Sequence, residues 1–89
     1  MTLFVSEFSS KASKQISKLD EVTKFRVRSK IERLENAPFP TDSKRLGGYN
    51  DEKVFRVRVG DLRILYLVRY NPNKVIIINV DKRSKVYER

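Results

Sequence analysis

The spacing of apolar residues changes period once along this chain, and that change limits the possible folds more than any other feature. Between residues 12 and 34 apolar side chains recur every three or four positions, which is typical of amphipathic helices. Between residues 54 and 80 they follow the period of two, or the continuous apolar run, that is typical of strands. Helices followed by strands predict an α+β fold, and a chain of 89 residues has room for a single core and one domain, 1–89.

The N-terminal part predicts one short strand and two helices. Residues 3–8 are predicted as the strand, followed by Ser9 and Ser10, which offer an N-cap for the first helix. Asp20 ends that helix and caps the second, which is expected to end at Asn36 before two prolines. The two helices are predicted to form a hairpin. The apolar positions of the second helix are Val22, Phe25, Val27, Ile31 and Leu34.

The C-terminal part predicts an antiparallel meander. Residues 41–53 show little apolar periodicity and are expected to be a connecting loop. Strands over 54–59 and 62–70 flank Gly60-Asp61, a favoured two-residue hairpin turn. Residues 75–80 are apolar on both pleat faces, so this strand is expected inside the sheet. The predicted architecture is β-α-α followed by an antiparallel β meander, with the helix hairpin packed on one sheet face and the other face left open.

Positive charge dominates the chain. It carries 20 Lys and Arg against 11 Asp and Glu, and residues 53–89 alone hold 10 basic and 3 acidic side chains. An excess of this size favours a polyanionic partner, although it can also serve solubility alone. Arginine is the residue suited to bidentate phosphate contacts. The arginines that lie in or beside strand-like runs are Arg56, Arg58, Arg63, Arg69 and Arg83.

Two residue types are absent from the sequence. Without cysteine the chain has no disulfide, thiolate metal site or cysteine nucleophile, and without histidine it has no imidazole base near neutral pH. We therefore expect no metal and no cofactor. The sequence shows no bilayer-spanning apolar run, and residues 1–7 lack a secretory signal pattern, so we expect a cytoplasmic protein with no membrane partner.

The strand at 54–59 concentrates charge on one face. Its alternation sends Arg56 and Arg58 to the side that the helices leave open, about 7 Å apart, since one strand residue rises roughly 3.3 Å. The turn then brings Arg63 near the same end of the hairpin. One alternative is that these arginines are ladder residues paired with carboxylates, although Asp61 is the one acid nearby in sequence.

Three segments, in this order, resemble the RelE/ParE superfamily of toxin–antitoxin toxins: Leu46–Tyr49, Phe55–Tyr66 and Val80–Tyr87. The resemblance covers essentially the whole chain and is closer to the RelE-like branch. It implies a metal-independent endoribonuclease that cleaves mRNA on the translating ribosome and is held inactive by a cognate antitoxin, with no direct DNA contact except through the antitoxin complex. A ParE-like inhibitor of DNA gyrase and a non-catalytic RNA- or ribosome-binding module remain alternatives.

The resemblance also implies which residues act. The catalytic set falls on Arg56, Arg58, Arg63, Arg83 and Tyr87, with Lys82 where some members have histidine or lysine. The described RelE pattern has lysines where this chain has Arg56 and Arg58, and a guanidinium gives up protons poorly, so Lys82 or a water is the implied proton donor. Tyr87 is implied to orient or deprotonate the ribose 2′-OH, or to stack on a base. Candidate RNA-binding residues, which can equally be solvated charge, are Lys44, Arg45 and Lys85.

Overall fold

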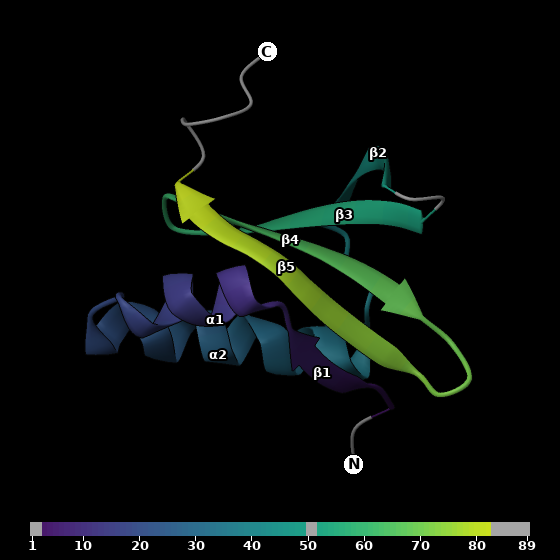
Figure 1. The fold of residues 1–89 in the computed structure, drawn as a ribbon, viewed down its shortest axis with the longest axis horizontal. Helices are drawn as coiled ribbons and strands as arrows, with labels where there is room; N and C mark the ends of the chain where they lie inside the picture. The colour runs from purple at the N-terminus through teal and green to yellow at the C-terminus, as the bar shows by residue number, and fades with distance from the viewer. Residues whose placement is uncertain (1–2, 50–51, 83–89) are drawn as a thin grey trace.

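The structure, a computed structural model, describes residues 3–49 and 52–82 and confirms the predicted fold class. Two helices pack on one five-stranded mixed sheet, whose strands lie in the order β1-β5-β4-β3-β2 (Figure 1). Strand β1 runs parallel to β5, and every other pair of neighbours is antiparallel. The elements in chain order are β1 (Val5–Phe8), α1 (Ser10–Ser17), α2 (Glu21–Asn36), β2 (Lys44–Tyr49), β3 (Glu52–Val59), β4 (Leu62–Arg69) and β5 (Lys74–Lys82).

Both helices begin at the predicted caps. The Ser9 hydroxyl accepts a hydrogen bond from the Ala12 backbone N–H at 3.0 Å, which satisfies one of the unpaired donors at the start of α1. The Asp20 carboxylate accepts one from the Thr23 N–H at 3.3 Å at the start of α2. Hydrogen bonds from the hydroxyl and then the N–H of Thr23 also lower the pKa of Asp20. Short polar side chains therefore set both helix starts.

Only three of the five apolar positions of α2 are buried. Val27, Ile31 and Leu34 are buried, whereas Val22 and Phe25 are 67% and 65% exposed. All five apolar positions lie in the predicted helix, but these two do not join the core. They lie about 140° and 160° around the helix from Val27, at roughly 100° per residue, and so face away from the sheet.

The segment predicted as a loop contains an extra strand. Lys44–Tyr49 forms β2, which pairs antiparallel with β3 and brings Lys44 opposite Arg56 and Arg45 opposite Phe55. The register shifts between Arg45 and Gly47, as in a β-bulge. Because the bulge and two glycines interrupt the period-two pattern, the sequence did not indicate a strand here. Strand β2 thus covers the outer edge of β3 between Glu52 and Arg56.

Strand β5 lies inside the sheet, between β1 and β4, as predicted. Strand β1 is too short to cover all of its edge, and α1 completes the cover. The Gln15 side chain accepts a hydrogen bond from the Val80 N–H at 2.7 Å and donates one to the Asn79 side-chain oxygen at 2.8 Å. A helix side chain therefore takes the place that a neighbouring strand would have on β5.

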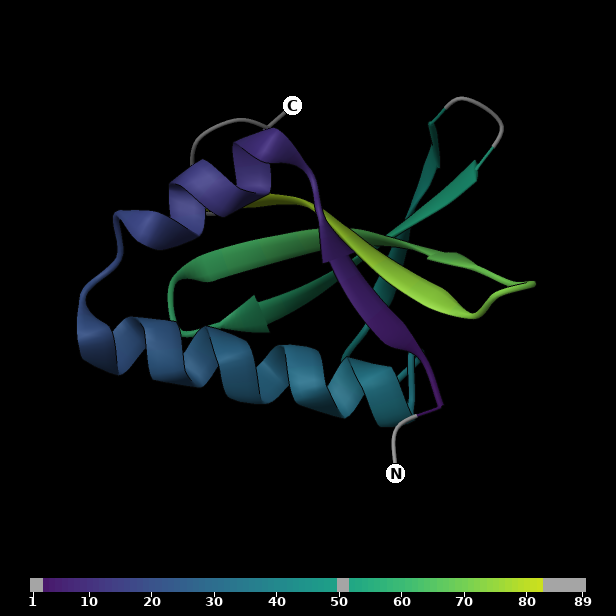
Figure 2. The ribbon, with the colours of Figure 1, turned by 60° about the horizontal axis from the view of Figure 1, so that its bottom comes forward.

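The main core lies between the helices and the sheet (Figure 2). Its largest fully buried side chain is Tyr66 of β4, whose hydroxyl donates a 2.7 Å hydrogen bond to the Pro38 carbonyl. On the other sheet face, which we call the open face, Val54 and Leu67 are register partners and are also buried. Within the described part of the chain, neither helix has the length and apolar character needed to cross a bilayer.

Candidate active site

Arg58 and Arg63 lie directly opposite each other in the β3–β4 hairpin. The turn between them is the predicted one: Val59 pairs with Leu62, and Gly60 has a φ of 57°, a conformation that glycine adopts without steric cost. Directly opposed residues share a sheet face, with Cβ atoms roughly 4.5–5.5 Å apart. The tight turn therefore brings two guanidinium side chains together at one end of the open face.

Arg56 is the next residue of β3 on the same face and is partly buried. Burial, and then repulsion by the positive charges of Arg58 and Arg63, lower the pKa of Arg56, while Asp42 acts weakly in the opposite direction. Among the residues that the structure describes, its Nε has no hydrogen-bond partner. The three side chains therefore influence one another electrostatically, and we call Arg56, Arg58 and Arg63 the arginine cluster.

Arg69 of β4, in the same sheet, is an arginine that is paired with a carboxylate on the neighbouring strand. Arg69 donates two hydrogen bonds to the carboxylate of Glu52, at 2.6 and 2.9 Å, and this pairing lowers the pKa of Glu52. Within residues 3–49 and 52–82, by contrast, neither Arg56 nor Arg58 forms an ion pair. The carboxylate-pairing alternative thus holds for Arg69 but not for these two members of the cluster.

The β4–β5 register adds an acid that sequence reasoning missed. Asp81 is the partner of Arg63 on β5, although it lies 18 residues away along the chain. Proximity in the sequence points to Asp61, and only the pairing of β4 with β5 reveals Asp81. One end of the arginine cluster is therefore bordered by a carboxylate.

The structure separates the remaining candidates. Lys44 lies opposite Arg56 and extends the row of cations on the open face, whereas Arg45 lies opposite Phe55, a residue packed against the core. Lys82 is paired with Leu62, so its face is the one that the helices cover, not that of the arginine cluster. Three further candidates lie outside the described residues: Arg83, Lys85 and Tyr87.

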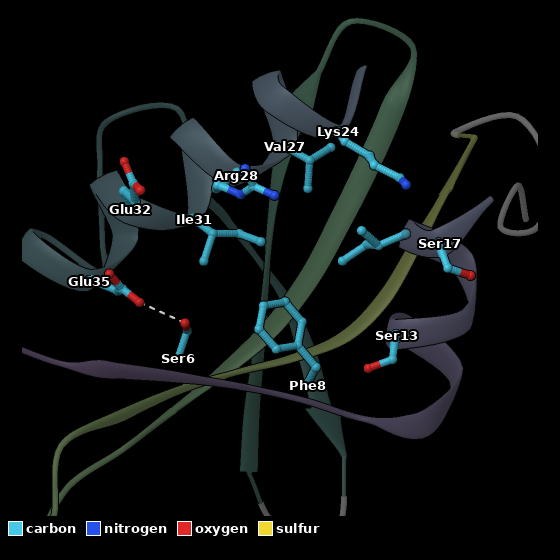
Figure 3. A pocket seen from close by; sticks show the side chains of 11 residues that line it. Ser6, Phe8, Ser13, Ser17, Lys24, Val27, Arg28, Ile31, Glu32 and Glu35 are labelled. Carbon is cyan, nitrogen blue, oxygen red and sulfur yellow. Dashed lines mark hydrogen bonds between the residues drawn. The ribbon is translucent and has the colours of Figure 1, made fainter. Parts of the chain in front are cut away.

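A separate cleft lies on the helix side, between α1, α2 and β1, with a volume of about 470 Å³ (Figure 3). Ser6 donates a 2.6 Å hydrogen bond to Glu35 at one end of it. Its rim carries both signs of charge, from Lys24 and Arg28 to Glu32 and Glu35. Among the described residues, no predicted site residue lines it, so this cleft is separate from the candidate site.

Comparison with known proteins identifies the class of this chain as the toxins of type II toxin–antitoxin systems. Residues 7–87 match the family described as ParE toxin of type II toxin-antitoxin system, parDE. The chain is 36% identical over 61 residues to the candidate toxin RelE1 of Methanocaldococcus jannaschii. That match covers 65% of this chain and 66% of the length of the relative.

Solved structures show the same fold. RelE in the RelE–RelB complex of Pyrococcus horikoshii OT3 superposes with a TM-score of 0.80 at 23% identity, covering 93% of this chain and 98% of that one. The isolated E. coli RelE toxin gives 0.75 at 25% identity, covering 94% and 90%. This chain belongs to the ParE toxin family, within the RelE/ParE superfamily of type II toxin–antitoxin toxins, and its fold is RelE-like.

Proposed function

We propose that this chain is a ribosome-dependent endoribonuclease that cleaves mRNA and so inhibits translation. The observation that carries the proposal is the arginine cluster, in which Arg58 and Arg63 face each other and Arg56 lies on the same face of β3. In the reaction, the ribose 2′-oxygen attacks the adjacent phosphorus and the 5′-oxygen leaves. The products are a 2′,3′-cyclic phosphate and a 5′-hydroxyl. The RNA supplies its own nucleophile, so the proposal requires neither a metal nor a cofactor.

The role of the arginine cluster in this reaction is electrostatic. Positive charges that repel one another in the free protein are stabilised by an anion between them, and more strongly as negative charge builds up on a pentacoordinate phosphorane. Since the cluster is built on two adjacent strands and a tight turn, its groups are already positioned before the RNA binds. Loss of one such donor in other enzymes lowers the rate about 10²- to 10³-fold.

Proton transfer needs groups other than the arginines. A guanidinium holds its proton too firmly to act as an acid near neutral pH. Lys82 lies on the opposite sheet face from the cluster, so we assign protonation of the leaving 5′-oxygen to water. Tyr87, as its phenolate, is proposed to take the proton of the 2′-OH and become the neutral phenol, and Arg83 is proposed to add positive charge. Lys44, which lies opposite Arg56, is proposed to contact the RNA backbone. Lys85 is also proposed to contact the RNA backbone.

The proposed partners are the ribosome with its mRNA and a cognate antitoxin, in the cytoplasm. RelE-like relatives have been solved in complex with RelB, in P. horikoshii and, as RelBE2, in Mycobacterium tuberculosis. An acidic antitoxin segment over the open face would neutralise the arginine cluster and exclude RNA from it. Such a partner would explain how a cell tolerates the toxin.

Inhibition of DNA gyrase is the second candidate function. The match of residues 7–87 to the ParE toxin family favours it, because the ParE-like branch acts on gyrase. In that case the same cations would contact a topoisomerase and no RNA would be cut.

One experiment separates these functions. The purified chain is added to a translation extract and to the same mRNA without ribosomes, and new 5′ ends are mapped. The proposal expects cleavage in the extract and little cleavage of naked mRNA. Intact mRNA together with inhibited DNA supercoiling would select the gyrase function. Salt-sensitive RNA binding without strand scission would select a non-catalytic RNA-binding module.

A further inference from the structure

A second concentration of positive charge lies outside the open face, in a groove between α2 and the end of β3. This open groove has a volume of about 460 Å³ and is lined by Arg26, Lys30 and Arg33 of α2 together with Arg58 of β3. Figure 2 shows the end of β3 running alongside α2. We call this feature the α2 groove. Sequence analysis did not single it out, because only the packing of α2 against the hairpin creates it.

The charges of the α2 groove are mostly uncompensated. Among its described lining residues there is no carboxylate. Lys30 reaches beyond the groove and donates a 2.7 Å hydrogen bond to Asp42, and this contact lowers the pKa of Asp42. In the described ranges, Arg26 and Arg33 form no ion pair, although the charge of Arg33 also contributes weakly to the lowered pKa of Asp42. The two exposed guanidinium groups are therefore available to bind an external anion.

The spacing of these two arginines suits a chain of anions rather than one ion. Arg26 and Arg33 are seven residues apart, so they lie on the same side of α2 and about 10 Å apart along its axis. Nucleic-acid phosphates recur at roughly 3.4 Å of rise per strand in a duplex. Phe25, 65% exposed, also lines the groove and offers an aromatic surface for a base.

The α2 groove is continuous with the arginine cluster because Arg58 belongs to both. At the turn between them, Arg26 approaches Gly60: its Nη1 lies 3.9 Å from the position that a Cβ would occupy there. An extended polyanion bound at Arg58 thus has a path past the turn and onto α2, lined by cations.

We infer that the α2 groove binds the phosphodiester backbone of the same RNA strand that the arginine cluster engages, a few nucleotides from the cleaved linkage. The inference rests on the proposed function, since it places the RNA strand at Arg58. The groove adds length-dependent affinity and holds the strand in register. Backbone contacts of this kind carry no sequence preference of their own.

The test measures binding without cleavage. The probe is fluorescein-labelled 2′-O-methyl RNA, which lacks the attacking hydroxyl, in a trinucleotide form and in a form of about twelve nucleotides. Binding to the full chain is followed by fluorescence anisotropy over a series of salt concentrations. The test variant is Arg26→Gln/Arg33→Gln. The matched control is Lys24→Gln/Arg28→Gln, which removes two cations from the same helix on the side of the other cleft. Glutamine keeps the helix propensity close to that of the residues replaced.

The inference expects a specific pattern. Affinity of the test variant for the longer RNA falls about tenfold at low salt, and the slope of log affinity against log salt becomes shallower by about 1.4, or 0.7 for each lost phosphate contact. Binding of the trinucleotide, which reaches only the arginine cluster, is unchanged within about twofold. The control variant keeps the wild-type slope on the longer RNA.

Other results overturn the inference. They are equal losses in both double variants, no loss in either, or no measurable binding of the longer RNA by the wild type. Failure of the proposed function is a distinct result. If the wild type never cuts mRNA in the extract but the length-dependent pattern holds, the α2 groove binds RNA in a protein that is not a ribonuclease.

Discussion

Arg58 and Arg63 are direct partners across the β3–β4 hairpin, two positive charges held opposite each other by a two-residue turn. Like charges at opposed positions destabilise a hairpin, so this arrangement is unfavourable for the fold alone. Arg56 adds a third charge, and burial, followed by repulsion from the other two arginines, lowers the pKa of its guanidinium. Sites that bind anions keep such unfavourable arrangements because the ligand relieves them.

Replacing Arg58 by alanine should lower mRNA cleavage in a translation extract about 10²- to 10³-fold, because one donor to the developing phosphorane is lost. Mapping of 5′ ends over time gives the rate. Arg69→Ala is the matched control: it removes an arginine from the same sheet, but one whose guanidinium is occupied by Glu52. Equal rates of mRNA cleavage for both variants would show that Arg58 has no catalytic role.

Replacing Arg56 by glutamine should raise the stability of the free protein while lowering its activity. Removal of a partly buried charge that two neighbours repel is expected to add about 0.5–1 kcal/mol to the free energy of unfolding. Urea denaturation at low salt measures this, and the gain should shrink at high salt as the repulsion is screened. Lys53→Gln, an exposed change on the same strand, is the control and should show no gain. A loss of stability in the Arg56 variant would contradict the assigned repulsion.

Replacing Gln15 by alanine should lower the free energy of unfolding by about 1–3 kcal/mol, because the Val80 N–H at the edge of β5 loses its acceptor. Hydrogen exchange at Val80 should accelerate as well. Ser17→Ala on the same helix is the comparison, since the hydroxyl of Ser17 makes only an exposed bond to the Lys14 carbonyl at 2.8 Å. Should the two variants lose equal stability, the role of Gln15 in covering β5 would be ruled out.

Stability should fall at alkaline pH in a way that depends on Tyr66. Burial raises the pKa of Tyr66 from 10.0 to about 12, so the unfolded chain releases this proton before the folded chain does. The contribution of the neutral phenol is complete below about pH 10. It is then lost as pH rises toward about 12, at about 1.4 kcal/mol per pH unit.

The readout is the difference in unfolding free energy between wild type and Tyr66→Phe. The variant loses the bond to the Pro38 carbonyl at every pH but is free of the alkaline decline that Tyr66 causes. The gap between the two proteins should therefore narrow above about pH 10. A gap that stays constant would mean that Tyr66 ionises as in water.

Local signals predicted most of the elements. Ser9 and Asp20 capped the helices as expected, since a short polar side chain next to a helix start acts within three residues. Gly60-Asp61 made the expected turn for a similarly local reason. Strand β2 was missed because its bulge and glycines leave no period to detect, and only the exposed edge of β3 gives it a partner.

The candidate site was predicted less completely. Alternation along β3 was enough to place Arg56 and Arg58 on the open face. It could not show that the guanidinium of Arg69 is paired with Glu52. It also could not show that Asp81 borders Arg63 or that Lys82 lies on the other face. These three placements depend on how neighbouring strands align with each other. The α2 groove was not predictable either, since it depends on how a helix lies beside a hairpin.

By itself, the sequence determined the order of helices and strands, the caps, the hairpin turn and the excess of positive charge, because each depends on neighbours a few residues apart. Tertiary structure alone decided which cations meet and which are neutralised. Strand register and helix packing bring together residues from distant parts of the chain, and a change of one residue in register would move every side chain of a strand to the other face.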